Sequence, residues 1–143
     1  MIAGLGCDIV KISRIAELLA SYGRKFEKKV FVAREIEGAP DNSAAAAYYA
    51  KRFAAKEAFA KAVGTGINSN LGFLDIEVIK DASGAPRILS KKFPMYNALL
   101  SLSDEKEFAI ACVIIFLKKK PTAEEMIPLA EEAPNKDELR GLC

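Results

Sequence analysis

The sequence predicts an α+β fold built as one domain. Its 143 residues leave room for a single hydrophobic core, and 51% apolar with 28% charged residues is a globular composition. Helical and strand-like patterns follow one another without the regular strand–helix–strand alternation of a parallel α/β sheet. The chain shows no internal repeat, so its elements are expected to pack on one another within one unit.

The N-terminal elements are predicted as a strand and two helices. Residues 2–12 are apolar and are expected to form a buried strand. Ser13 is a suitable N-cap for a helix over residues 14–22, whose apolar residues recur on one face and which Gly23 ends. A short helix is expected over residues 31–37, before a turn rich in glycine, proline and asparagine.

The longest predicted element is an alanine-rich helix over residues 44–63. We expect Ser43 to cap its first turn and Gly64 to end it. Residues 71–80 then alternate between polar and apolar side chains, which predicts a strand with one exposed face.

The remaining elements are predicted as two hairpins separated by a helix. A turn over residues 81–84 leads into a short strand at residues 86–89. Residues 91–100 are expected to form a helix with a proline in its first turn. Residues 101–103 and 107–117 close the fold as strands, joined as a hairpin.

The domain is expected to span residues 1–118, followed by an acidic tail over residues 119–143 that we expect to be mobile and inert. Residues 1–120 hold 19 basic and 13 acidic residues, a net charge of +6. Residues 121–143 hold 2 basic and 6 acidic residues, a net charge of −4. A basic body attracts an acidic protein or a phosphorylated ligand, although a solvated surface with a slight bias explains the charge equally well.

Composition also excludes several kinds of site. The sequence has no histidine, which rules out Ser-His-Asp and Cys-His catalysis and zinc sites with imidazole ligands. Cys7, Cys112 and Cys143 are far apart in the sequence, so no disulfide framework or iron–sulfur cluster is expected. The longest apolar run, residues 108–117, is half of what a bilayer requires, and no signal-peptide pattern is seen. We therefore expect a cytoplasmic protein that does not act at a membrane, and any metal to be held by oxygen ligands, with Mg²⁺ first.

Spacing on the long helix indicates one candidate site. Glu57, Lys61 and Gly64 are separated by four and three residues and therefore lie on one helix face. An ordinary Glu–Lys pair followed by a glycine cap explains the same spacing, and spacing alone favours that simpler interpretation. Asp8 lies in the apolar first strand, beside space left by Gly6, and needs a partner there unless it caps the next turn. Together, Asp8 and Glu57 could supply two oxygen ligands of Mg²⁺, with phosphate and water completing the set.

Two motifs are specific enough to indicate a family. The first is GLGCDIV at residues 4–10, and the second is the run F-x-x-K-E-A-x-x-K-A-x-G-x-G over residues 53–66. With these motifs the sequence resembles holo-acyl-carrier-protein synthase, the small single-repeat class of the 4′-phosphopantetheinyl transferase family. The resemblance covers about residues 1–118, nearly the whole predicted domain.

The resemblance implies a fold and a reaction. The fold is an antiparallel sheet packed on a long helix, assembling as a homotrimer with each active site between neighbouring subunits. The reaction transfers 4′-phosphopantetheine from coenzyme A to a serine of apo acyl carrier protein, releases 3′,5′-ADP, depends on magnesium and serves fatty acid biosynthesis. A fatty-acid and a polyketide carrier protein are both compatible with the sequence.

The resemblance also assigns roles by position. Asp8 and Glu57 would bind the metal and Lys61 would contact phosphate, so we expect these three residues to be catalytic. The first helix, expected to be basic, would bind the acidic carrier protein through Arg14, Leu18 and Tyr22. Coenzyme A would be bound by Arg52, Lys61, Gly64, Pro86 and Asp104.

Asp104 departs from the family, which usually has histidine at this position near the coenzyme's phosphates. Aspartate could act as a base or an outer-shell metal ligand but would repel a phosphate, and a simple hairpin-turn aspartate is the favoured interpretation. We expect an active enzyme because Asp8, Glu57 and Lys61 remain. The alternative is a non-catalytic relative that binds coenzyme A or the carrier protein and lost turnover with the histidine. A nucleic-acid-binding protein is weaker still, because the basic residues are scattered and tryptophan is absent.

Overall fold

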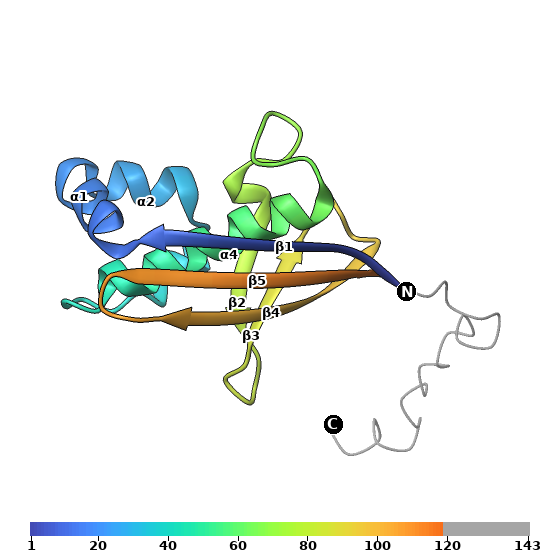
Figure 1. Ribbon diagram of the computed structural model, residues 1–143. Helices are drawn as coiled ribbons and strands as arrows, with labels where there is room; N and C mark the ends of the chain where they lie inside the picture. The colour runs from blue at the N-terminus through green and yellow to red at the C-terminus, as the bar shows by residue number, and fades with distance from the viewer. Residues whose placement is uncertain (119–143) are drawn as a thin grey trace, which may run out of the picture.

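The computed structural model describes residues 1–118, and the predicted acidic tail lies outside this range (Figure 1). The α+β class is confirmed. None of the described helices is both long and apolar enough to cross a membrane. The elements in chain order are β1 Ile2–Lys11, α1 Ile12–Tyr22, α2 Arg24–Val30, α3 Ala33–Glu37, α4 Ala45–Val63, the 3-10 turn η1 Phe73–Asp75, β2 Ile76–Lys80, β3 Pro86–Ser90, β4 Tyr96–Asp104 and β5 Phe108–Leu117.

Three long strands form an antiparallel sheet in the order β1-β5-β4, and β2 and β3 form a separate antiparallel pair. Figure 1 shows the three strands side by side with α4 packed behind them and α1 and α2 at one end. The antiparallel sheet packed on a long helix, which the family resemblance implied, is therefore confirmed.

The two faces of this sheet differ in burial, because side chains alternate along each strand. The face against α4 is buried, with Val10 on β1 and Ala109, Ala111 and Val113 on β5. The outer face is apolar but exposed, so the prediction of a buried strand at residues 2–12 is wrong for one of its two faces. The exposed apolar residues of that face are Leu5, Ile9, Leu99, Phe108 and Ile110.

Gly4 and Gly6 allow β1 to lie directly on the backbone of α4. A Cβ atom at Gly4 would overlap the carbonyl oxygen of Ala62, and one at Gly6 would overlap the carbonyl oxygen of Ala58. The expectation that Gly6 leaves open space beside Asp8 is therefore wrong, because the helix fills that space. Small residues on both elements set this close approach.

The predicted helix over residues 91–100 is wrong, because Tyr96–Asp104 is strand β4 and the residues before it form turns. Leu100 and Leu102 point towards the core, and β4 pairs along its whole length with β5. The apolar spacing suits either period, and the hydrogen bonds offered by β5 decide in favour of the strand.

Helix α2, which follows Gly23 directly, was not predicted from the sequence. Gly23 ends α1 as expected, with φ at +47°, and its position between two helices turns the chain sharply. Phe26 and Val30 bury the inner face of α2. Seven residues are too few to show a helical period clearly.

Neither predicted serine cap is found. Helix α1 begins at Ile12 after Lys11, which places Ser13 inside the helix. Helix α4 begins after Ala44, whose backbone N–H donates to Oδ1 of Asn42 at 2.9 Å. Gly64 does end α4, as expected.

Candidate functional site

Asp8 and Lys61 form the centre of the candidate site. The Lys61 ammonium donates to Oδ1 of Asp8 at 2.7 Å and to the Cys7 carbonyl oxygen at 3.1 Å. This hydrogen bond raises the pKa of Lys61. The Asp8 side chain is 15% exposed and that of Lys61 is 50% exposed, so the pair lies at the edge of the β1–α4 contact. The carboxylate in the apolar strand therefore has the partner that its environment requires.

Glu57 lies one turn before Lys61 and faces the same pair. Burial raises the pKa of Glu57, and the negative charge of Asp8 raises it further, while Lys61 and Arg14 act in the opposite direction. Elements β1, α1 and α4 thus place Asp8, Arg14 and Lys61 close enough to Glu57 to affect its pKa. The simpler interpretation of Glu57 and Lys61 as an isolated helix pair does not describe the site, because the ion pair of Lys61 joins α4 to β1.

Two carboxylates alone do not make a complete metal site. Within residues 1–118, no group of three or more histidine, cysteine or acidic side chains is placed to hold a metal ion. Asp8 and Glu57 lie close enough for one charge to disfavour the other, and a bound cation would relieve that repulsion. The chemistry of the pair therefore suits Mg²⁺ if a ligand and water supply further oxygen atoms.

Gly64 opens the end of α4 beside this cluster. Its φ of +88° is a left-handed conformation that favours glycine, and its N–H donates to the carbonyl oxygen of Ala60 at 3.1 Å. A Cβ atom built at Gly64 would have no neighbour within 4 Å among the described residues. A ligand could therefore approach the helix end closely.

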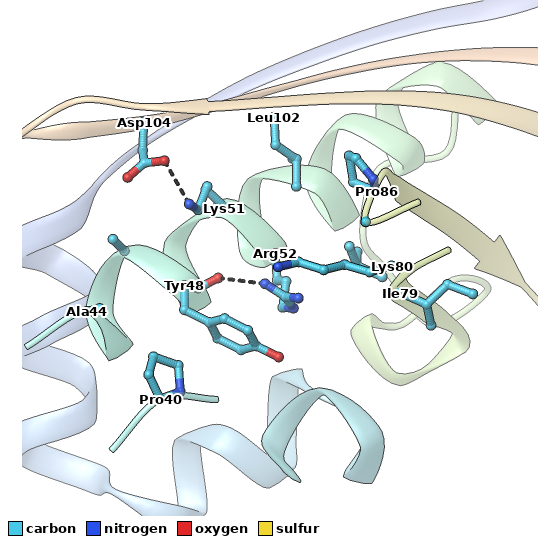
Figure 2. Close-up of a pocket in the computed structure, with 13 residues that line it drawn as sticks. Pro40, Ala44, Tyr48, Lys51, Arg52, Ile79, Lys80, Pro86, Leu102 and Asp104 are labelled. Carbon is cyan, nitrogen blue, oxygen red and sulfur yellow. Dashed lines mark hydrogen bonds and ion pairs between the residues drawn. The ribbon is translucent and has the colours of Figure 1, made fainter. Parts of the chain in front are cut away.

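A separate cavity of about 410 Å³ lies between α4, the β2–β3 pair and β4 (Figure 2). Three of the residues expected to bind coenzyme A line it, namely Arg52, Pro86 and Asp104. The other two, Lys61 and Gly64, do not line it and belong to the Asp8 cluster. The residues predicted to bind coenzyme A therefore lie in two separate parts of one chain, the cavity and the Asp8 cluster.

Arg52 is a fixed cation in this cavity. Its guanidinium carbon lies 3.5 Å from the centre of the Tyr48 ring, and its Nη1 donates to the Tyr48 carbonyl oxygen at 3.4 Å. The side chain is 7% exposed, and burial lowers the pKa of Arg52. Its Nε is buried and has no hydrogen-bond partner in the described part of the chain. Buried polar atoms usually have partners, so this donor is available to a bound ligand.

The sequence favoured Asp104 as a simple hairpin-turn residue, and the structure shows instead that its side chain is paired. Asp104 ends β4, and its Oδ1 accepts a hydrogen bond from the Lys51 ammonium at 2.7 Å (Figure 2). Lys51 lies beside Arg52 on α4 and lines the same cavity. Lys51 was not predicted from the sequence, because its partner is 53 positions away and no local pattern joins the two.

The predicted carrier-protein residues differ in exposure. Arg14 and Tyr22 are exposed, whereas Leu18 is half-buried and packs against the core. Helix α1 contains one arginine and one glutamate, so the expectation of a basic first helix is wrong. The positive charge lies on the neighbouring α2, which has four basic residues and one acidic residue.

Comparison with known proteins identifies relatives over most of the chain. Residues 4–113 match the model of the 4′-phosphopantetheinyl transferase superfamily. A holo-acyl-carrier-protein synthase of Ehrlichia chaffeensis is 43% identical over 120 residues, covering 81% of this chain and 98% of that protein. One of Wolbachia pipientis is 44% identical over 121 residues, covering 80% of this chain and 98% of that protein.

Solved structures of proteins with the same name have the same fold. The Bacillus anthracis protein, in complex with CoA (3′,5′-ADP), has a TM-score of 0.73 at 40% identity and covers 80% of this chain and 96% of its own. The Helicobacter pylori protein, in complex with coenzyme A, has a TM-score of 0.72 at 34% identity, with 78% and 99% covered. The likeness therefore extends well beyond the two sequence motifs.

Proposed function

The chain belongs to the 4′-phosphopantetheinyl transferase superfamily, among the holo-acyl-carrier-protein synthases, and on this premise we propose its reaction in detail. It transfers 4′-phosphopantetheine from coenzyme A to a serine of apo acyl carrier protein, releases 3′,5′-ADP and requires Mg²⁺. The observation that carries this proposal is the convergence of Asp8, Glu57 and Lys61 beside the open end of α4. A pair of carboxylates with one ammonium suits a phosphate bound together with a divalent cation.

Each of the three residues has a separate task in the proposed mechanism. Asp8 and Glu57 would hold Mg²⁺, which supplies charge neutralisation at the pyrophosphate of coenzyme A. Lys61 would donate to oxygen atoms of the phosphate under attack. Its ammonium has three donors, two of which contact Asp8 and Cys7, so one remains for the substrate.

The cavity around Arg52 and Pro86 is the proposed nucleotide site. A cation fixed on an aromatic ring, with a free buried donor, suits a phosphate, and the proline and tyrosine surfaces suit a flat base. The bound nucleotide of the Bacillus anthracis relative supports a site of this class in the family.

A homotrimer would join the two separated groups of residues. Asp8 lies on β1 and Asp104 on β4, the opposite edges of the three-stranded sheet. We propose that the Asp8 cluster of one subunit meets the Arg52 cavity of its neighbour, so that each active site lies between two subunits. The exposed apolar outer face of the sheet supports an assembly, because such a patch is unusual on a monomer.

The proposed protein partner is an acidic acyl carrier protein bound over α1 and α2. Arg14 and Tyr22 are exposed on α1, Leu18 contributes its accessible edge, and the basic side chains of α2 lie alongside. Opposite charges would steer the carrier towards this surface. We place the reaction in the cytoplasm and in fatty acid biosynthesis, with no role in nucleic-acid binding.

The direct test is mass spectrometry of an apo acyl carrier protein after incubation with the full chain, coenzyme A and Mg²⁺. A mass gain of one phosphopantetheine is expected, and it should be absent with the Asp8→Ala or Glu57→Ala variant although both remain folded. Coenzyme A binding without any mass gain, over a panel of carriers, would support the non-catalytic relative instead. Full activity of either variant would overturn the metal assignment.

A further inference from the structure

The rim of the nucleotide cavity contains an ion pair that the mechanism above does not use. Lys51 on α4 and Asp104 at the end of β4 are 2.7 Å apart, with side chains 30% and 35% exposed. Both residues line the cavity, together with Arg52. Figure 2 shows the pair at one side of the hollow, between the helix and the strand.

The charges around this cavity favour an anionic ligand. Its charged lining residues are Lys51, Arg52, Lys80 and Asp104, three cations and one anion. The single carboxylate already accepts a hydrogen bond from Lys51, so its charge is compensated before any ligand arrives. An aspartate at this position therefore need not repel a phosphate, provided that Lys51 stays paired with it.

Lys51 also retains capacity for a ligand. An ammonium group has three donors, and Asp104 is the one acceptor that Lys51 contacts among residues 1–118. The ion pair restrains a flexible side chain before binding, which reduces the entropy lost when a ligand is held.

We propose that Lys51, positioned by Asp104, is a phosphate ligand for the nucleotide part of coenzyme A. This inference rests on the proposed function, since it assumes that the cavity binds the coenzyme. Asp104 then acts through Lys51 and does not itself touch the phosphate. The pair would supply the cationic contact at a position where the chain has no histidine.

The competing explanation is that the pair only ties β4 to α4. A structural tie predicts that its loss lowers the thermal midpoint and leaves coenzyme affinity unchanged. A phosphate ligand predicts that affinity falls, and that an unpaired Asp104 makes the loss worse by repelling the phosphate. A purely structural pair does not predict that an unpaired Asp104 weakens coenzyme binding further.

The test is calorimetric titration of the full chain with coenzyme A, 3′,5′-ADP and dephospho-coenzyme A. Lys51→Met should weaken binding of coenzyme A and of 3′,5′-ADP by about tenfold, a typical effect of losing one charged contact. The double variant Lys51→Met with Asp104→Asn should bind more tightly than Lys51→Met alone. Lys92→Met is the matched control, because Lys92 pairs with Asp75 at 3.1 Å outside this cavity, and it should bind like wild type.

Each outcome bears on the proposal. If the loss caused by Lys51→Met disappears with dephospho-coenzyme A, Lys51 contacts the 3′-phosphate; if it persists, Lys51 contacts the 5′-phosphates. Wild-type affinity in Lys51→Met would overturn the inference and leave the proposed function intact. Failure of the wild-type chain to bind coenzyme A would overturn both.

Discussion

Gly6 is the residue whose lack of a side chain brings Asp8 to the long helix. Its backbone contacts α4 at Ala58, and two residues later the strand presents Asp8 to Lys61. The geometry of the proposed catalytic cluster therefore depends on a position with no chemical function of its own.

Substitution of Gly6 by alanine should separate β1 from α4. We expect Gly6→Ala to lower the free energy of unfolding by about 2 kcal/mol or more, because a methyl group would be forced into a packed interface. Urea denaturation measures this loss, and transfer activity should fall with it as Asp8 moves from Lys61. The control is Gly72→Ala, since a Cβ there meets Oδ2 of Asp75 at an ordinary 3.5 Å. Wild-type stability in Gly6→Ala would contradict the role assigned to this contact.

Lys56 precedes Glu57 in the sequence but contacts different elements. Its ammonium donates to Glu35 at 2.7 Å, to the Val30 carbonyl oxygen at 2.8 Å and to that of Phe73 at 3.0 Å. Both charged side chains are fully buried, and burial lowers the pKa of Lys56. The pair thus fixes α4 against three segments while Glu57 faces β1.

Removal of both members of this pair should cost less than the two single removals added together. Glu35→Gln and Lys56→Met should each lower the free energy of unfolding by about 3 kcal/mol, because each leaves a buried charge without its partner. The double variant should lose less than the sum of the two, which a denaturation cycle measures. The pair of Arg34 and Glu77 is the comparison, because its arginine is exposed, and Arg34→Met should cost less than about 1 kcal/mol. If the double variant lost as much free energy of unfolding as the two single variants added together, the two buried charges would not stabilise each other.

At the scale of elements, the β2–β3 hairpin depends on one carboxylate. Oδ1 of Asp81 accepts hydrogen bonds from Ser83 N, Ser83 Oγ and Ala85 N, and Oδ2 accepts from Arg87. These donors, led by Ser83 and Arg87, lower the pKa of Asp81 to about 2. The hairpin carries Pro86 to the rim of the proposed nucleotide cavity.

The titration of Asp81 predicts how this hairpin responds to acid. A lowered pKa in the folded state means that its stabilisation is complete above the ordinary value of 3.8 and is lost as pH falls towards about 2. The carboxyl carbon of Asp81, followed by NMR, should therefore titrate near 2. The Arg87→Met variant should titrate at higher pH, because one donor to the carboxylate is gone. An ordinary midpoint in the wild type would contradict the hydrogen bonding described.

Helices α1 and α2 together make the proposed carrier-protein surface. Arg14 also lies close enough to Glu57 to lower its pKa, so a change at Arg14 would disturb both carrier binding and the catalytic cluster. Lys25 and Lys28 on α2 are exposed, so substitutions there test carrier binding separately from the catalytic cluster.

Reversal of charge on α2 should weaken carrier binding alone. The double variant Lys25→Glu with Lys28→Glu should raise KM for an acidic acyl carrier protein about tenfold at low salt, with less effect at high salt. Steady-state kinetics should show unchanged KM for coenzyme A. The control is Lys91→Glu, an exposed charge reversal outside α1 and α2. Unchanged carrier KM in the double variant would remove α2 from the proposed surface.

For the whole molecule, the central feature is the exposed apolar face of the sheet. Its residues come from all three strands, and Leu5 and Leu99 are 67% and 52% exposed in one chain. A face of this kind, on the side of the sheet away from α4, is a natural interface between copies.

A charge on this face should separate the subunits. Leu5→Asp should convert the proposed trimer to a monomer in analytical ultracentrifugation and abolish transfer, because the two parts of each proposed site would come apart. The control Leu89→Asp places the same charge at a leucine that is 51% exposed on β3, outside this sheet.

A mixing experiment tests the shared site in the intact assembly. Trimers that mix Asp8→Ala and Arg52→Ala subunits should recover activity absent from either variant, because some interfaces then join two unaltered parts. A wild-type chain that is monomeric and active would refute the assembly, and an absence of recovery in mixed trimers would refute the shared site.

Much of the fold was predictable from local pattern. The long helix, its end at Gly64, the β2–β3 hairpin and the final strand all depend on spacing or on turn residues that neighbours in the sequence determine. Residues 101–103 were predicted as a strand, but helix α2 and the first half of strand β4 were not, because one is short and the other has apolar spacing that fits either period. In both cases, packing against distant segments decides the conformation.

The sequence alone determined the family, the α+β class and the residue types available for chemistry. Its motifs singled out Asp8, Glu57 and Lys61, and the absence of histidine, together with the wide separation of the cysteines in the sequence, favoured oxygen donors as metal ligands. The tertiary structure alone decided which residues meet: Lys61 pairs with Asp8, and Lys51 with Asp104. These contacts join residues 53 positions apart, and only the packing of α4 on the sheet brings such residues within hydrogen-bond distance.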